Sequence, residues 1–81
     1  ITVRYFASIR EAIGQGSEAV ETAATTLGAL RDELIARGGA HASSLARGRA
    51  VRMALNQTLS DESATLADGA EVAFFPPVTG G

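Results

Sequence analysis

The sequence predicts an α+β fold in which a mixed sheet of about four to five strands packs on one main helix. Two observations lead to this prediction. Short segments of alternating apolar and polar residues stand toward both ends of the chain, and one long amphipathic stretch lies between them. The 81 residues suffice for one domain, with a small core that needs no metal or disulfide. The absence of cysteine excludes disulfides and thiolate-bound metal.

The first part of the chain is expected to hold two strands and a short helix. Residues 1–6 alternate with a period of two, which predicts a strand in the interior of the sheet. Residues 7–13 carry two isoleucines four positions apart, which predicts a short helix that Gly14 ends. Residues 17–22 form a weaker strand, antiparallel to the first, with Val20 as its main apolar residue.

The main helix is expected to begin after Thr25 or Thr26, because either hydroxyl can cap its first turn. The next apolar residues recur at positions i, i+3, i+7 and i+8 and form one core-facing stripe: Leu27, Leu30, Leu34 and Ile35. The charged residues are assigned to the solvent side: Arg31, Asp32, Glu33 and Arg37. Gly38-Gly39 then stops the helix.

Residues 41–49 are the least patterned stretch, and we expect a single helical turn around residues 44–46. His41, Ser43 and Ser44 are residue types found in nucleophilic sites. A nucleophile and its base must converge in space, with a third group that orients the base. Neighbours in a surface loop seldom meet this condition, so a catalytic role is disfavoured.

The last part of the chain alternates again and predicts three strands. Residues 51–56 present an apolar inner face, and a tight turn at 56–57 leads into a short strand near residues 58–59. Residues 66–69 indicate a small anchored loop and a turn. Residues 71–75 form the last strand.

This order of elements, with both ends of the domain in the sheet, is typical of a β-grasp fold, whose first and last strands pair in parallel at the centre. We assign residues 1–75 to this domain and residues 76–81 to an extended tail. Pro76-Pro77 favours a polyproline path, and Gly80-Gly81 has no side chain to pack. The tail could reach roughly 20 Å at about 3.3–3.6 Å per residue. A frayed terminus is the alternative interpretation.

The alternation within the last strand bears on function. Val72 and Phe74 share one face, and Glu71, Ala73 and Phe75 share the other. If Glu71 is in water, Phe75 points to the same outer side, next to the tail. An exposed phenylalanine at this place indicates a partner surface. The alternative is that Phe75 folds under a loop.

Charge and hydropathy exclude several classes of protein. A net charge of −2 and a pI near 5.2 argue against a nucleic-acid binder. No apolar run approaches the length of a membrane helix. The close arginines Arg47, Arg49 and Arg52 could meet an acidic partner, although a solvated surface is favoured. Gly14-Gln15-Gly16 follows a helix and not a strand, so phosphate binding is disfavoured.

The sequence contains no metal cluster, carboxylate dyad, triad or phosphate loop, so a stand-alone enzyme is not expected. The remaining reactive group is the α-carboxylate of Gly81. A terminal carboxylate, with a pKa of about 3.5, is ionised at neutral pH and is a poor electrophile. It becomes an electrophile when another protein uses ATP to convert it to an acyl-adenylate. Two glycines would let the terminus thread a narrow channel and approach a phosphate closely.

The last eight residues, Phe74-Phe75-Pro76-Pro77-Val78-Thr79-Gly80-Gly81, resemble the ending of the small, sulfur-carrying subunits of molybdopterin synthase, which have the ubiquitin-like β-grasp fold. The resemblance extends to Asn56-Gln57-Thr58-Leu59 and to residues 66–73. Near the start it includes Tyr5-Phe6-Ala7, Arg10-Glu11 and Gly14. Residues 17–49 match in pattern alone.

The resemblance implies that a ubiquitin-activating-like adenylyltransferase activates Gly81 with ATP and that a sulfur donor leaves a Gly81 thiocarboxylate. The tail then enters the large synthase subunit, where Val78 and Thr79 line the channel, and gives sulfur to cyclic pyranopterin monophosphate. Phe75 docks on both partners in turn. The resemblance also implies a cytoplasmic heterotetramer, no permanently bound cofactor, and catalytic residues on the large subunit.

Three other functions stay open. A thiamine-pathway sulfur carrier uses the same chemistry, although the Phe-Phe-Pro-Pro lead-in argues against it. A ubiquitin-like modifier would join Gly81 to a lysine of a target protein. A plain interaction module would keep its tail unmodified.

Overall fold

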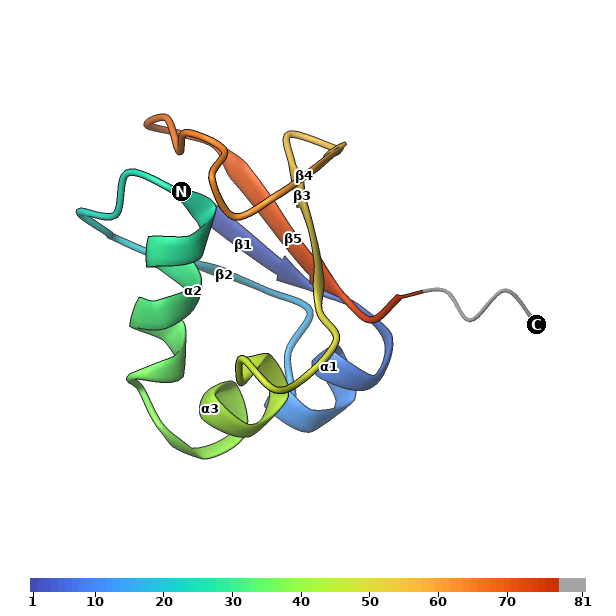
Figure 1. The fold of residues 1–81 in the computed structure, drawn as a ribbon. Coiled ribbons are helices and arrows are strands. Elements are labelled where there is room, and N and C mark those ends of the chain that lie inside the picture. The colour runs from blue at the N-terminus through green and yellow to red at the C-terminus, as the bar shows by residue number, and fades with distance from the viewer. Residues whose placement is uncertain (78–81) are drawn as a thin grey trace.

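The computed structural model describes residues 1–77, and the predictions for Val78, Thr79, Gly80 and Gly81 lie outside the described residues. The described chain forms a five-stranded mixed sheet and three helices (Figure 1). In chain order these elements are β1 (Thr2–Tyr5), α1 (Ala7–Ile13), β2 (Ser17–Ala19), α2 (Leu27–Ile35), α3 (Gly39–Leu45), β3 (Arg52–Leu55), β4 (Thr58–Ser60) and β5 (Glu71–Phe75).

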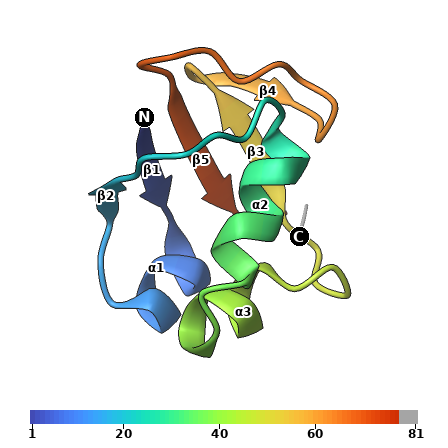
Figure 2. The same cartoon turned by 90° about the vertical axis from the view of Figure 1, so that its left-hand side faces the viewer.

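The strand order is β2-β1-β5-β3-β4. β1 pairs in parallel with β5, and the other three pairings are antiparallel. Figure 2 shows α2 across one face of the sheet, with α1 and α3 near one end of it. The predicted α+β class and the parallel pairing of the first and last strands are both confirmed.

The core lies between the sheet and α2. The register places Val3 beside Val72 and Tyr5 beside Phe74, and all four side chains are buried. The rings of Tyr5 and Phe74 stack with their centroids 6.3 Å apart. The two central strands are thus joined by apolar packing as well as by their hydrogen bonds, which fixes the path of β5.

The Thr26 hydroxyl caps α2 by accepting a hydrogen bond from the Ala29 N–H at 3.2 Å, as one of the two predicted caps. The predicted apolar stripe is also confirmed, with Leu27, Leu30 and Leu34 buried and Ile35 packed at its edge.

The assignment of Arg31 to the solvent side is wrong, because this residue is 4% exposed. Its Nε donates to the Leu45 carbonyl at 2.7 Å, and its Nη2 donates to the Ala46 carbonyl at 2.8 Å. These carbonyls lie at the end of α3, where a helix leaves backbone acceptors without partners. The guanidinium supplies the missing donors, and this tertiary need decides its burial.

The prediction of a single turn around residues 44–46 is also wrong, since α3 covers Gly39–Leu45. Gly38, with a φ of +78°, lets the chain turn between α2 and α3. Ser44 and Leu45 are buried. The small Ala and Ser side chains of α3 give almost no apolar periodicity, and packing against α1 and α2 stabilises the helix instead.

The remaining predictions differ from the structure in detail. β2 ends at Ala19, short of the predicted residue 22, although Val20 is buried as expected. Asn56 and Gln57 have φ of +49° and +69°, as the tight turn between β3 and β4 requires. The Leu66 N–H donates to the Thr25 carbonyl at 2.9 Å, which anchors the predicted loop. Within residues 1–77, no helix has the length and apolar character needed to cross a membrane.

Candidate tail-presenting site and outer face

The candidate site begins where β5 ends, because the predicted tail follows directly. β5 lies between β1 and β3, with Phe74 in register with Tyr5 on one side and Phe75 with Arg52 on the other. The Phe74 carbonyl also accepts a hydrogen bond from the Phe6 N–H at 3.1 Å. Neighbours on both sides therefore hold the base of the tail in place.

The face of the sheet opposite α2, which we call the outer face, receives alternate side chains of β5. Val72 and Phe74 are buried in the core, whereas Glu71, Ala73 and Phe75 lie on the outer side and are partly exposed. The predicted alternation is confirmed. Phe75 is only partly exposed, however, and lies on a strand with neighbours on both sides.

The exposed large apolar side chains of the described residues are Phe6, at 39%, and Leu59, at 63%. Phe6 follows Tyr5, which is in register with Phe74, so Phe6 lies beside Phe75. Leu59 is in register with Ala54, which in turn faces Ala73. The outer face thus carries an apolar surface made of Phe6, Ala54, Leu59, Ala73 and Phe75.

Phe6 and Leu59 are residues of this surface that were not predicted from the sequence. Within residues 1–6 the side chains alternate, so Phe6 lies on the face opposite to the core residues Val3 and Tyr5. This alternation is the signal that could have placed Phe6 on the outer face. No comparable pattern marks Leu59, because β4 has only three residues. Its place on the outer face follows from its pairing with β3.

Two arginines lie next to this apolar surface. The Arg4 guanidinium is 5.2 Å from the centroid of the Phe6 ring, and its Nη1 is 3.8 Å from Glu71 Oε2. Arg52 is exposed and lies beside Phe75. The outer face therefore combines apolar side chains with positive charge, a composition typical of a protein interface.

Comparisons with known proteins agree with this geometry. Residues 3–81 match the ThiS family. The chain belongs to the ThiS family. It is 43% identical over 81 residues to the molybdopterin synthase sulfur carrier subunit of Escherichia coli K12 and 40% identical to that of Haemophilus influenzae. In both comparisons the match covers 100% of this chain and 99% of the relative.

Solved structures show the same fold. SAMP1 from Haloferax volcanii superimposes with a TM-score of 0.77 at 26% identity, covering 99% of this chain and 97% of that one. A putative molybdopterin converting factor subunit 1 from Pyrococcus furiosus gives 0.77 at 27% identity, covering 95% of each chain. A complex of subunits 1 and 2 of the molybdopterin-converting factor from Helicobacter pylori gives 0.66 at 29%, covering 99% and 96%. The predicted ubiquitin-like β-grasp family is confirmed.

The disfavoured catalytic group of this ThiS-family chain is not assembled. His41 Nε2 lies 3.0 Å from Glu18 Oε2, and the Ser43 hydroxyl donates to the Ala40 carbonyl. Ser44 is buried in α3. Within residues 1–77 the histidine hydrogen-bonds to neither serine, so these residues do not make a nucleophile–base pair.

Glu18 is instead the centre of a structural cluster. Its carboxylate accepts hydrogen bonds from the Tyr5 hydroxyl at 2.7 Å and from Arg37 Nη1 at 2.6 Å, in addition to its contact with His41. Burial disfavours the charged carboxylate, but the hydrogen bonds from Arg37, His41 and Tyr5 outweigh this effect and lower the pKa of Glu18 to about 2. The cluster joins β1 and β2 to α3 and to the segment that follows α2.

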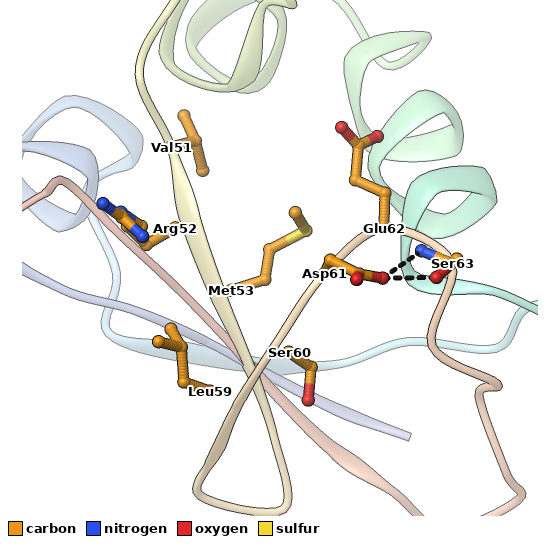
Figure 3. A pocket seen from close by; sticks show the side chains of 8 residues that line it. All are labelled: Val51, Arg52, Met53, Leu59, Ser60, Asp61, Glu62 and Ser63. Atoms are coloured by element: carbon orange, nitrogen blue, oxygen red, sulfur yellow. Dashed lines mark hydrogen bonds between the residues drawn. The ribbon is translucent and has the colours of Figure 1, made fainter.

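An open groove of about 720 Å³ lies beside β3 and β4. In Figure 3, Arg52 and Leu59 lie on one side of the β3 ribbon, and Asp61, Glu62 and Ser63 lie on the other. Asp61 accepts hydrogen bonds from Ser63, and Glu62 forms ion pairs with Arg31 and Arg47. Both carboxylates therefore have structural partners within the chain. Over residues 1–77, no group of His, Asp and Glu side chains is arranged to hold a metal ion.

Proposed function

We propose that the chain is a sulfur carrier for molybdopterin synthase, with the sulfur carried as a thiocarboxylate on Gly81. The observation that carries this proposal is the full-length identity of 40–43% to two molybdopterin synthase sulfur carrier subunits. The geometry supports it, because β5 presents the residues before the tail from the rigid centre of the sheet.

Activation uses ATP and a separate adenylyltransferase. The Gly81 carboxylate attacks the α-phosphorus of ATP, pyrophosphate leaves, and an acyl-adenylate forms. The terminal sulfur of a donor persulfide then attacks the acyl carbon and displaces AMP. Cleavage of the resulting acyl disulfide by a thiol leaves the thiocarboxylate. In this proposal the partner consumes ATP in the cytoplasm, and the carrier holds no permanent cofactor.

Delivery requires a partner that receives the tail. The likeness to subunit 1 in the Helicobacter pylori complex supports a large synthase subunit in this role. In this proposal the outer face docks on that subunit, and the tail, Pro76 to Gly81, enters its active site. There the thiocarboxylate gives its sulfur to cyclic pyranopterin monophosphate. The catalytic side chains belong to the large subunit, and two carriers serve a large-subunit dimer.

Deletion of Gly81 tests the role of the terminus. The shortened chain should give no molybdopterin with the cognate large subunit, the activating partner, ATP and a sulfur donor. Its melting temperature should match that of the full chain, because the described core ends at β5. Molybdopterin formed by the shortened chain would contradict the proposal. A large loss of stability would show that the tail is structural.

Protein modification is the second candidate. SAMP1, the small archaeal modifier protein 1 of Haloferax volcanii, has the same fold at 26% identity. A lysine amine of a target would then attack the activated Gly81 carbonyl and form an isopeptide bond. Mass spectrometry of cell lysate distinguishes the two functions. Gly81 isopeptide adducts would establish the modifier role, and their absence with active molybdopterin synthesis would exclude it.

A further inference from the structure

Three arginines lie close together in the sequence, and the structure separates their roles. Arg47 forms ion pairs with Asp32 and Glu62. Arg49 Nε donates to the Ser43 carbonyl at 3.2 Å. Both therefore fasten the segment before β3 to the helices. Arg52 has an exposed side chain and no ion pair with any residue of the described range 1–77.

Arg52 occupies a distinctive place on the outer face. It is in register with Phe75, the last residue of β5, and so stands beside the base of the tail. On the other side of β5, Arg4 is in register with Ala73. The two guanidiniums therefore flank the strand that leads to the tail. Arg4 already has Glu71 as a partner, whereas Arg52 points away from Asp61 and Glu62 (Figure 3).

A protein that receives the tail must approach Phe75 and will cover Arg52. Covering a guanidinium without a counter-ion is unfavourable, because the charge loses its hydration. A carboxylate placed opposite it removes this cost, since a guanidinium donates two parallel hydrogen bonds to a carboxylate. Productive docking at this place therefore needs an acid on the partner.

We propose that Arg52 pairs with a carboxylate of the large synthase subunit at the mouth of the channel that receives the tail, and that this pair helps to select the cognate subunit. The inference rests on the proposed function, because it takes its partner from there. Arg4 adds positive charge to the same contact but is partly neutralised by Glu71. The apolar surface supplies contact area, and Arg52 supplies specificity.

Calorimetric titration of the unmodified full chain with its cognate large subunit tests this inference. Arg52→Gln removes the charge and keeps most of the side-chain length, and Arg49→Gln is the matched control away from the outer face. At low salt, Arg52→Gln should bind roughly tenfold more weakly than the wild type, and Arg52→Glu more weakly still. The Arg52→Gln difference should shrink as salt is added, because the charges are screened. Arg49→Gln should bind like the wild type.

Wild-type affinity of Arg52→Gln at low salt would overturn the inference. A loss that is independent of salt, or an equal loss in Arg49→Gln, would also overturn it. Melting temperatures show whether each variant is folded. A parallel assay of molybdopterin synthesis by the wild-type chain tests the proposed function separately. If the wild-type chain gave no molybdopterin, the proposed function would be refuted. The difference in affinity between Arg52→Gln and Arg49→Gln would still show whether Arg52 contributes to binding.

Discussion

Arg31 and Arg52 carry the same side chain in opposite surroundings. Arg31 is 4% exposed and donates to two backbone carbonyls at the end of α3, whereas Arg52 lies in water on the outer face. The sequence predicts the solvent side of the helix for Arg31 and a solvated surface for Arg52. The difference arises from backbone acceptors that only the folded chain brings together.

Replacement of Arg31 by methionine tests this contrast. Arg31→Met keeps the apolar bulk but leaves the carbonyls of Leu45 and Ala46 without these donors. The free energy of unfolding should fall by about 2–4 kcal/mol. Arg52→Gln, an exposed control, should change it by less than about 0.5 kcal/mol. Urea denaturation measures both values, and equal values for the two variants would contradict the structural role of Arg31.

Leu59 gives the corresponding test of the apolar surface. Leu59→Ala should leave the free energy of unfolding within about 0.5 kcal/mol of the wild type, because the side chain is 63% exposed. Its affinity for the large subunit should fall roughly tenfold, as for an interface residue that costs over 1 kcal/mol when truncated. Thr25→Ala, at an exposed residue outside this apolar surface, is the control for calorimetry. Unchanged affinity of Leu59→Ala would remove Leu59 from the interface.

Alternation and capping residues in the sequence predict most of the helices and strands. The strands with alternating side chains, the Thr26 cap and the last strand all lie where they were predicted. α3 does not, because its small side chains carry no period and its stability comes from neighbours. Alternation along the last strand predicts the outer position of Phe75. It does not predict that of Leu59, because the face on which Leu59 lies depends on the pairing of β4 with β3.

The Glu18 cluster joins several elements and predicts a pH dependence. Hydrogen bonds lower the pKa of Glu18 to about 2 in the folded chain, below the ordinary value for glutamate. Its ionised form therefore stabilises the fold above pH 5, and this contribution is lost as the pH falls from about 5 to about 2. Glu18→Gln should be less stable at neutral pH and should lose less stability over this range. Thermal unfolding across the range measures both, and parallel curves for the two proteins would contradict the role of Glu18.

The whole molecule divides its sheet between two tasks. One face packs on α2 and forms the core (Figures 1 and 2). The outer face keeps its apolar and positive side chains exposed or partly exposed around the end of β5. The tail follows from the centre of the sheet, where β1 and β3 hold its base. In the proposed function, this small domain presents its terminus to successive partners from a rigid sheet.

The intact mass of the chain shows whether Gly81 carries the sulfur. The full chain is incubated with its adenylating partner, ATP and a persulfide sulfur donor, and the products are analysed by mass spectrometry with fragmentation of the C-terminus. We expect one oxygen-to-sulfur exchange, located on Gly81 and dependent on ATP. Unmodified protein alone, with a partner shown to be active on another carrier, would contradict it.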